Sequence, residues 1–237
     1  MNNFIYIDIE TIPSQKPEAR DEIAKAISVP GNISKPETIA KWHAEKKPLA
    51  IEDAWRKTSF NGDRGEVVCI AWAYNDETPE SVQRDVNGSE AELLGAFFSN
   101  IAKNMKSMHR LPTFIGHNVR DFDLRFLWHR AVILGVKPEV SLPHNVRPGD
   151  DRIYDTMTEW AGWGGKISLD RLCRALGIPL KGSELGGEEI DGSKVWDFVE
   201  AGRIDEVVAY CRADVERVRG VHQRMTFCQQ ETSVRAA

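Results

Sequence analysis

The sequence predicts an α/β or α+β protein in which helices cover the faces of a β-sheet. Two observations carry this prediction. Apolar, β-branched segments of strand length come early in the chain, and helical patterns then alternate with them and fill the C-terminal half. The predicted strands span residues 4–10, 66–74 and 112–118, with a short one near 81–86, and the predicted helices span 88–104, 121–135, 168–177, 193–202 and 204–229.

Residues with strong local preferences set some of the boundaries. Ser89 and Glu92 form the capping-box pattern that begins helices, and Gly135 is typical of a helix C-terminus. Between the first two strands, residues 14–65 are polar, helix-leaning and interrupted by prolines. This segment is too small to have a core of its own. We therefore expect one domain, 1–237, with a helical insertion at 14–65.

Composition and charge place limits on the function. The 237 residues carry a formal net charge of −5, which excludes a strongly basic nucleic-acid-binding protein but allows a local basic groove. The four cysteines are scattered without a C-x-x-C pair, so no zinc site or disulfide framework is predicted. Neither an export signal nor an apolar run of the roughly 20 residues that a membrane span needs is visible. We expect a soluble, cytoplasmic protein without a membrane partner.

Two acidic residues stand close together in the first predicted strand. Asp8 and Glu10 are separated by one residue, so their side chains point to the same face. Apolar residues on both faces predict a central strand, where unpaired charges are costly. Two carboxylates about 5 Å apart repel by roughly 3 kcal/mol at an effective dielectric constant near 20. Because the strand contains no lysine or arginine, a divalent metal ion is the natural partner.

The last predicted helix carries two more candidate side chains. Its apolar residues recur at helical spacing and form a stripe that is expected to face the core. That stripe consists of Ile204, Val208, Cys211, Val215 and Val218. Tyr210 and Asp214 lie one turn apart, roughly 80–120° from the centre of the stripe. They are therefore expected at the border between core and solvent, where a side chain is anchored yet reachable.

A further acid lies where the strand at 112–118 gives way to a helix. Both Asp121 and Asp123 fall near the start of that helix. Because Asp is a favoured N-cap residue, we expect one of the two to cap the helix. The residues alone leave open which of them has another role.

Three segments, in this order, resemble the motifs of the DEDD 3′–5′ exonucleases: YIDIETIP, GHNVRDFDLRFL and YCRAD. The first supplies the D-x-E pair Asp8 and Glu10, and the second supplies an aspartate after an Asn-x-x-x-Phe run. The third supplies a Tyr-x-x-x-Asp pair, Tyr210 and Asp214, whose tyrosine is typical of the DEDDy subclass. The pattern extends over residues 4–218 and resembles stand-alone bacterial and phage proteins related to the exonuclease domain of family B DNA polymerases.

The resemblance implies a ribonuclease-H-like (DnaQ-like) α/β fold, with a mixed central β-sheet flanked by helices. It assigns Asp123 as a metal ligand and leaves Asp121 as the helix cap. The implied activity is a metal-dependent 3′–5′ exonuclease that acts on DNA 3′ ends, with single-stranded DNA as the expected substrate and nucleoside 5′-monophosphates as products. Two Mg²⁺ or Mn²⁺ ions are implied, held by Asp8, Glu10, Asp123 and Asp214. Tyr210 is implied to orient the attacking water, since a phenol is mostly neutral at pH 7.

Substrate contacts are expected beside this catalytic set. The residues concerned are Thr11, Asn118, Arg120, Phe122 and Lys181. Trp160 and Trp163 lie three residues apart, a spacing more typical of core residues, although indole rings can also stack on bases. The insertion at 14–65 departs from the family pattern, in which many relatives have a tight hairpin. Its effect on substrate access and strand preference is left open.

Three other functions are compatible with parts of this pattern. An exonuclease that trims RNA is the nearest alternative, because discrimination between DNA and RNA depends on the space around the 2′-OH. A non-catalytic nucleic-acid-binding module on the same fold would be favoured by the loss of a carboxylate, and all four are present. A glycosidase could use Asp8 and Glu10 as its acid pair, but side-by-side carboxylates on one strand are too close for the roughly 5–9.5 Å spacing of those reactions.

Overall fold

The computed structural model describes residues 3–106, 111–147, 149–179 and 192–228. Its centre is a five-stranded sheet in the order β3-β2-β1-β4-β5. β1 pairs antiparallel with β2 and parallel with β4, while β3 is antiparallel to β2 and β5 is parallel to β4. The strands are β1 (Phe4–Ile12), β2 (Glu66–Tyr74), β3 (Glu80–Gln83), β4 (Thr113–Gly116) and β5 (Ile153–Asp155). The sheet is therefore mixed, as predicted, and β1 is its middle strand.

After β3, the described part of the chain forms six helices. They are α4 (Glu90–Lys106), α5 (Asp123–Leu134), α6 (Thr156–Ala161), α7 (Leu169–Leu176), α8 (Val195–Glu200) and α9 (Ile204–Met225). The predicted ends of two of them are confirmed: Glu92 N donates to Ser89 Oγ at the start of α4, and Gly135 ends α5 with a φ of 68°. The prediction that the last helix extends to Gln229 is wrong: α9 ends at Met225. Phe227 then adopts a φ of 56°, which an α-helix cannot contain.

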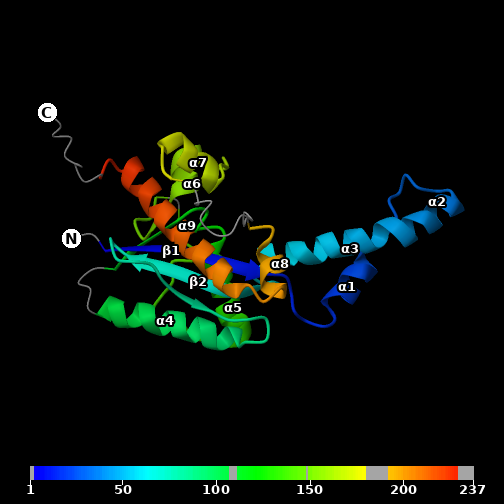
Figure 1. The fold of residues 1–237 in the computed structure, drawn as a ribbon, viewed down its shortest axis with the longest axis horizontal. Coiled ribbons are helices and arrows are strands. Elements are labelled where there is room, and N and C mark those ends of the chain that lie inside the picture. The colour runs from blue at the N-terminus through cyan, green and yellow to red at the C-terminus, as the bar shows by residue number, and fades with distance from the viewer. Residues whose placement is uncertain (1–2, 107–110, 148, 180–191, 229–237) are drawn as a thin grey trace.

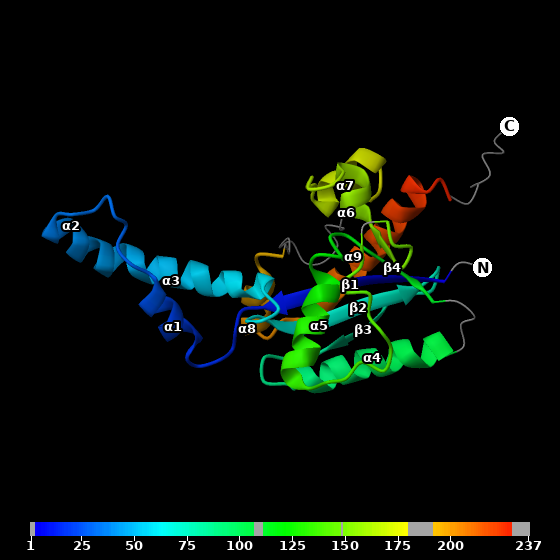
Figure 2. The same cartoon turned by 180° about the vertical axis from the view of Figure 1, so that it is seen from behind.

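Helices cover both faces of the sheet (Figures 1 and 2). On one face, Ile5, Ile7 and Ile9 of β1 pack in a core that includes side chains of α4 and α5. On the other face, Tyr6 and Ile12 pack in a core that includes side chains of α8 and α9. Because side chains alternate along a strand, β1 presents Asp8 and Glu10 to the α9 face.

Between β1 and β2 the chain forms a helical arm that projects from the sheet (Figure 1). The arm consists of α1 (Ala19–Ala26), α2 (Pro36–Lys41), a π-helical turn (Trp42–Lys46), α3 (Lys47–Arg56) and a 3₁₀ turn (Lys57–Phe60). Its small core contains Ala19, Ile23 and Trp55. Trp55 attaches the arm to the body, because its Nε1 donates to Ser14 O at 2.9 Å and its ring meets Trp196 of α8 edge to face at 5.2 Å.

The tryptophans near α6 are not core residues. Trp160 is 45% exposed and Trp163 is 72% exposed, so the prediction that both belong to the core is wrong. The reason is local: α6 ends at Ala161, and Gly162 adopts a φ of 76°. This conformation favours glycine and redirects the chain, so the two indoles do not share one face of a helix.

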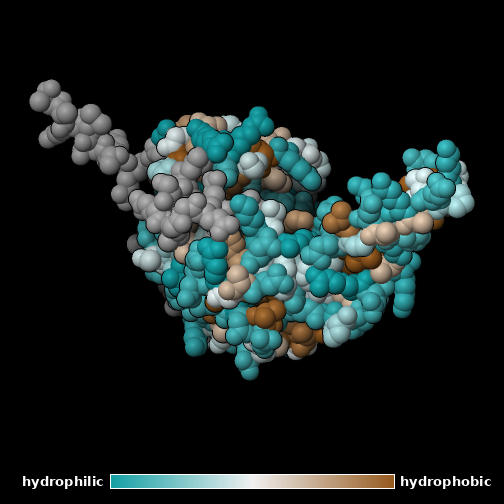
Figure 3. All heavy atoms as spheres, turned by 45° about the vertical axis from the view of Figure 1, so that its right-hand side comes forward, coloured by the Kyte–Doolittle hydropathy of each residue, from teal (hydrophilic) through white to brown (hydrophobic). Residues whose placement is uncertain are grey.

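One face of the molecule agrees with the polar composition of the chain. The face drawn in Figure 3 is mostly hydrophilic, with hydrophobic residues in small patches on the body and along the arm. Among the described residues, none of the helices has both the length and the apolar character that a membrane crossing requires.

Candidate active site

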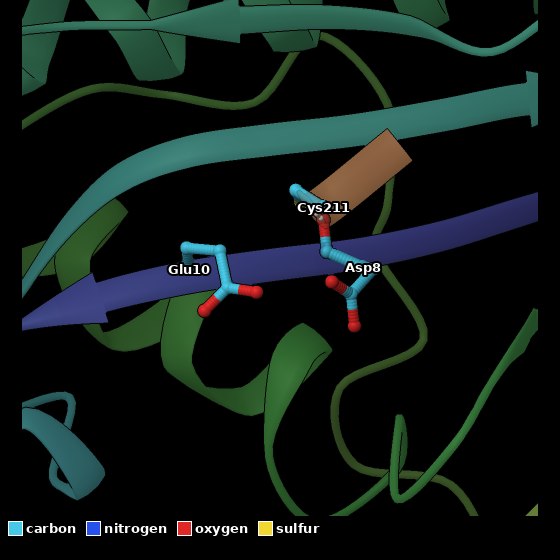
Figure 4. A group of neighbouring side chains, drawn as sticks. All are labelled: Asp8, Glu10 and Cys211. Atoms are coloured by element: carbon cyan, nitrogen blue, oxygen red, sulfur yellow. Dashed lines mark hydrogen bonds between the residues drawn. The ribbon is translucent and has the colours of Figure 1, made fainter. Parts of the chain in front are cut away.

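Strand β1 presents an acidic pair beside α9. Asp8 is paired with Ala71 and Glu10 with Cys69 of β2, and the register shifts after Glu10. Such a bulge bends the strand locally. Glu10 is 7% exposed and Asp8 is partly buried. Figure 4 shows both carboxylates on the same side of β1, as the two-residue spacing requires.

Helix α9 brings a thiol against this pair. Cys211 Sγ donates to the backbone oxygen of Asp8 at 3.4 Å, and one ligand atom each from Asp8, Glu10 and Cys211 lie within 4.8 Å of one another (Figure 4). Burial raises the pKa of Cys211 well above its ordinary value, and a hydrogen bond with Cys69 acts in the same direction. Because the thiolate is the form that binds metals, the two carboxylates are the better ligands of this group.

Tyr210 lies on α9, the helix that packs against the β1 face carrying Asp8 and Glu10. Burial raises the pKa of its phenol well above the ordinary value of 10, and the charges of Glu10, Asp214 and Asp8 raise it further. The charges of these three carboxylates therefore all act on the same phenol. At neutral pH the phenol stays protonated, so it can donate a hydrogen bond but cannot act as a base.

Asp123 is the first residue of α5 and contacts β1 directly. It is 3% exposed, and its Oδ1 accepts a hydrogen bond of 3.1 Å from the backbone N–H of Ile9. Ile9 lies between Asp8 and Glu10, so this bond fixes the start of α5 against the acidic segment. Burial raises the pKa of Asp123 to about 7, and the charge of Asp155 adds to the effect.

Asp121 does not cap α5, so that prediction is wrong. The N-cap position is held by Phe122, with no side-chain cap, and Asp121 is exposed. Backbone carbonyls accept hydrogen bonds from the N–H groups at the start of the helix: Asn118 O accepts from Phe122 N, and Val119 O accepts from Leu124 N. The loop before the helix thus satisfies N–H groups that a capping side chain would otherwise meet.

Asp214 is bound to a cation on its own helix. Its side chain is 8% exposed, and its Oδ1 accepts a hydrogen bond of 2.8 Å from Arg217 Nε. The same guanidinium also forms an ion pair with Asp170. Sequence reasoning missed Arg217, although the spacing of three residues on a helix is typical of ion pairs. Of the four predicted ligands, Asp8 and Glu10 belong to the close group around Cys211, whereas Asp123 and Asp214 are engaged by Ile9 and Arg217.

Asp155 is a second residue that sequence reasoning missed. It ends β5, is 1% exposed and caps α6 through hydrogen bonds from Met157 N and Thr158 N. It also accepts hydrogen bonds from Asn118 N at 3.0 Å and Arg120 N at 3.1 Å. This carboxylate therefore holds the loop that leads into Asp123. An Asp directly after an apolar strand and before a helix is the signal that could have indicated a cap.

Two of the predicted substrate contacts lie at the ends of parallel strands. Thr11 follows the acidic pair in β1, and its hydroxyl donates to Ser59 O of the arm at 2.8 Å. Thr11 also lines a pocket between β1, the arm and Trp196. Asn118 follows β4 with a φ of 65°, a left-handed conformation that asparagine tolerates better than most residues.

The other predicted contacts differ in their surroundings. Phe122 is partly buried and packs its ring 5.5 Å from that of Phe126, against the core under α5. Arg120 is 6% exposed. Lys181 lies outside the described residues. Contact with a substrate stays a prediction for all five.

The raised pKa of Asp123 leads to a stability prediction for the metal-free protein. Because the folded-state pKa of about 7 lies above the ordinary value, the protonated form stabilises the fold, and this contribution is lost as the pH rises through 7. In the presence of EDTA, we expect the melting temperature of the wild type to fall between pH 5 and pH 8 relative to that of Asp123→Asn. A constant difference between the two proteins across this range, measured by circular dichroism melts, would contradict the assignment.

The chain matches a family model described as a predicted 3′–5′ exonuclease related to the exonuclease domain of PolB, over residues 65–235. The match contains Asp123, Tyr210 and Asp214, whereas β1 with its acidic pair precedes it. No curated protein gives a match.

Among solved structures, the chain is similar to the family B DNA polymerase from the hyperthermophilic archaeon Pyrobaculum calidifontis, with a TM-score of 0.58 and 16% identity. The similarity covers 95% of this chain and 25% of the polymerase chain, so this chain spans about a quarter of the polymerase. At that identity the likeness concerns the fold, and it confirms the predicted ribonuclease-H-like architecture.

Proposed function

Because the chain belongs to the family of predicted 3′–5′ exonucleases related to the exonuclease domain of PolB, we propose that it removes nucleoside 5′-monophosphates from the 3′ ends of single-stranded DNA with two divalent metal ions. The observation that supports this proposal is the close approach of Asp8 and Glu10 on β1, with Asp123 hydrogen-bonded to the backbone between them. β1, β4 and β5 are parallel to one another, so their carboxyl ends meet where α5 begins and α9 passes. Sites of α/β proteins lie at such edges.

The donor set fits hard divalent cations. Asp8 and Glu10 approach each other on a largely buried face. With Asp123 and Asp214 added, the proposed ligands are all carboxylate oxygens. Mg²⁺ and Mn²⁺ prefer oxygen ligands. When bound, such ions supply Lewis-acid activation of a water molecule and neutralise the charge on the leaving 3′ oxygen. To bind a metal ion, Asp214 would have to share its negative charge between the metal and Arg217. Asp123 would have to lose the proton that burial favours.

Tyr210 would position the water that attacks the phosphate. Its phenol stays neutral because burial and three neighbouring acids oppose its ionisation. It can therefore donate its hydrogen bond or accept one from water, and the proton released by the attack must pass to another acceptor. Removal of this hydroxyl affects the orientation of the nucleophile while the carboxylates remain in place.

The direct test is digestion of oligonucleotides labelled at one end, as matched DNA and RNA, with Mn²⁺ or with EDTA. We expect 5′-labelled single-stranded DNA to give a ladder that shortens with time. The 3′-labelled DNA should release labelled mononucleotide first, and EDTA should stop both reactions. A ladder from the 3′-labelled strand, or full activity in EDTA, would contradict the proposal, and faster degradation of RNA would reassign the substrate. An Asp8→Asn protein prepared in the same way controls for contaminating nucleases.

A further inference from the structure

Arg120 has an unusual environment for an arginine in a loop. The residue is 6% exposed, and its Nε atom is fully shielded from solvent. Within the described part of the chain, its Nε atom has no hydrogen-bond partner, and the guanidinium interacts electrostatically with Asp150, whose carboxylate is already paired with Arg152. Buried cations are normally paired, because removal from water is costly. The unsatisfied Nε atom of this buried cation therefore points to an anion that the protein binds from solution.

Trp163 stands beside this cation. The Arg120 Cζ atom lies 5.9 Å from the centre of the Trp163 ring, at the outer limit of a cation–π contact. The indole is 72% exposed, so most of its surface is open to solvent. Gly162 and Gly164 flank it with φ values of 76° and 78°. Both conformations favour glycine, so the backbone turns on each side of Trp163.

One carboxylate connects both residues to the candidate active site. Asp155 Oδ2 accepts the hydrogen bond from Arg120 N, and Asp155 Oδ1 caps α6, the short helix that leads to Trp163. Arg120 lies three residues before Asp123. The pair is therefore held at the same edge of the sheet as the predicted metal ligands, on the side of β5.

We propose that Arg120 and Trp163 form a nucleotide subsite for an unpaired strand, in which the indole stacks on a base and the guanidinium binds a backbone phosphate. This inference rests on the proposed function, and it adds the residues that select single-stranded substrate. Stacking on an aromatic ring requires a base whose face is free, as in a single strand. Arginine is well suited to the phosphate because its planar group offers several donors.

The test is the affinity for a 5′-labelled oligothymidylate, measured by fluorescence anisotropy in EDTA so that neither metal nor turnover is involved. Trp163→Ala should weaken binding about tenfold, since stacking contributes roughly 1–3 kcal/mol per base. Trp160→Ala is the matched control. Trp160 lies three residues away and lines a different pocket with Leu176 and Met225, so its removal should change the affinity by less than about twofold.

Arg120→Met tests the phosphate contact, with Arg125→Met, an exposed arginine on α5, as its control. The Arg120 variant should weaken binding and reduce the slope of log affinity against log salt by about 0.7, the value for one phosphate on a single strand. Thermal melts establish that the variants are folded. Wild-type affinity in both Trp163→Ala and Arg120→Met would overturn the subsite, and so would equal losses in the two control variants.

Hydrolysis separates the subsite from the proposed function. With the p-nitrophenyl ester of thymidine 5′-monophosphate, which has no upstream strand, Trp163→Ala should retain wild-type kcat/KM, while KM for the oligonucleotide rises about tenfold. An equal loss on both substrates would overturn the subsite and indicate damage to the catalytic centre. If the wild type hydrolyses neither substrate, the proposed exonuclease function fails, and the anisotropy measurements still decide whether the subsite exists.

Discussion

Asp123→Asn is expected to lower kcat/KM for single-stranded DNA by at least about 1,000-fold. Asp123 is buried at the first turn of α5 and is attached to the backbone between Asp8 and Glu10. A metal contributes several kcal/mol of transition-state stabilisation, and each 1.4 kcal/mol corresponds to a factor of ten in rate. The amide keeps the shape of the side chain but removes the charge that a metal ion needs. Titration calorimetry should show that the variant also binds Mn²⁺ more weakly than the wild type does.

Asp121→Asn is the control, because it changes the same functional group two residues earlier. Asp121 is exposed and forms no cap of α5, so we expect its substitution to leave kcat/KM within about twofold of the wild type. Comparable losses in the two variants would show that the loop, rather than the Asp123 carboxylate, carries the effect. A fully active Asp123→Asn protein would remove this residue from the proposed metal site.

The parts of the fold that the sequence predicted well are those where one physical signal dominates. The apolar run of β1 and β2, the apolar stripe of α9 and the Gly135 terminus of α5 all appear as expected. The grouping of Asp8 and Glu10 on one face follows from strand geometry alone. The position of Tyr210 beside these acids follows from helix geometry once α9 is known to lie across β1.

The errors arose where tertiary contacts outweighed local preference. Asp121 and Asp123 are equivalent candidates for a cap by residue type, and only the contact with Ile9 N distinguishes them. The three-residue spacing of Trp160 and Trp163 would place them on one helix face, but the helix ends between them at Ala161. β5 is three residues long, too short for a periodic pattern to reveal it.

Charge compensation at the site is also a tertiary property. In the absence of metal, Asp214 is neutralised by Arg217, and burial favours the protonated form of Asp123. In the metal-free protein, neither carboxylate is therefore a buried charge without compensation. The expected consequence is that metal binding competes with a proton at Asp123 and with an arginine at Asp214, and neither competitor is visible in the motif residues themselves.

Asp155→Ala is expected to destabilise the protein by about 3–5 kcal/mol and to reduce activity at the same time. The carboxylate is 1% exposed and accepts hydrogen bonds from four backbone N–H groups, those of Asn118, Arg120, Met157 and Thr158. Alanine leaves these donors without their acceptor, and hydrogen bonds to charged groups contribute roughly 1.5–3 kcal/mol each, less where water enters. The melting temperature should fall by roughly 10 °C for a chain of this size.

Asp155→Asn separates the two roles of this carboxylate, capping α6 and holding the Arg120 loop, because its two oxygens have different partners. Oδ1 accepts from three of the donors, and Oδ2 accepts from Arg120 N alone. The amide oxygen can take the place of Oδ1, whereas its NH₂ group would face the N–H of Arg120. The loss of stability should therefore be about half that of Asp155→Ala. The oligonucleotide affinity should fall in both variants, because each releases the Arg120 loop. Asp151→Asn, at an exposed acid just before β5, should match the wild type in both measurements. If Asp155→Asn is as unstable as Asp155→Ala but binds the oligonucleotide normally, the loop is positioned by other contacts and Asp155 serves only as the cap of α6.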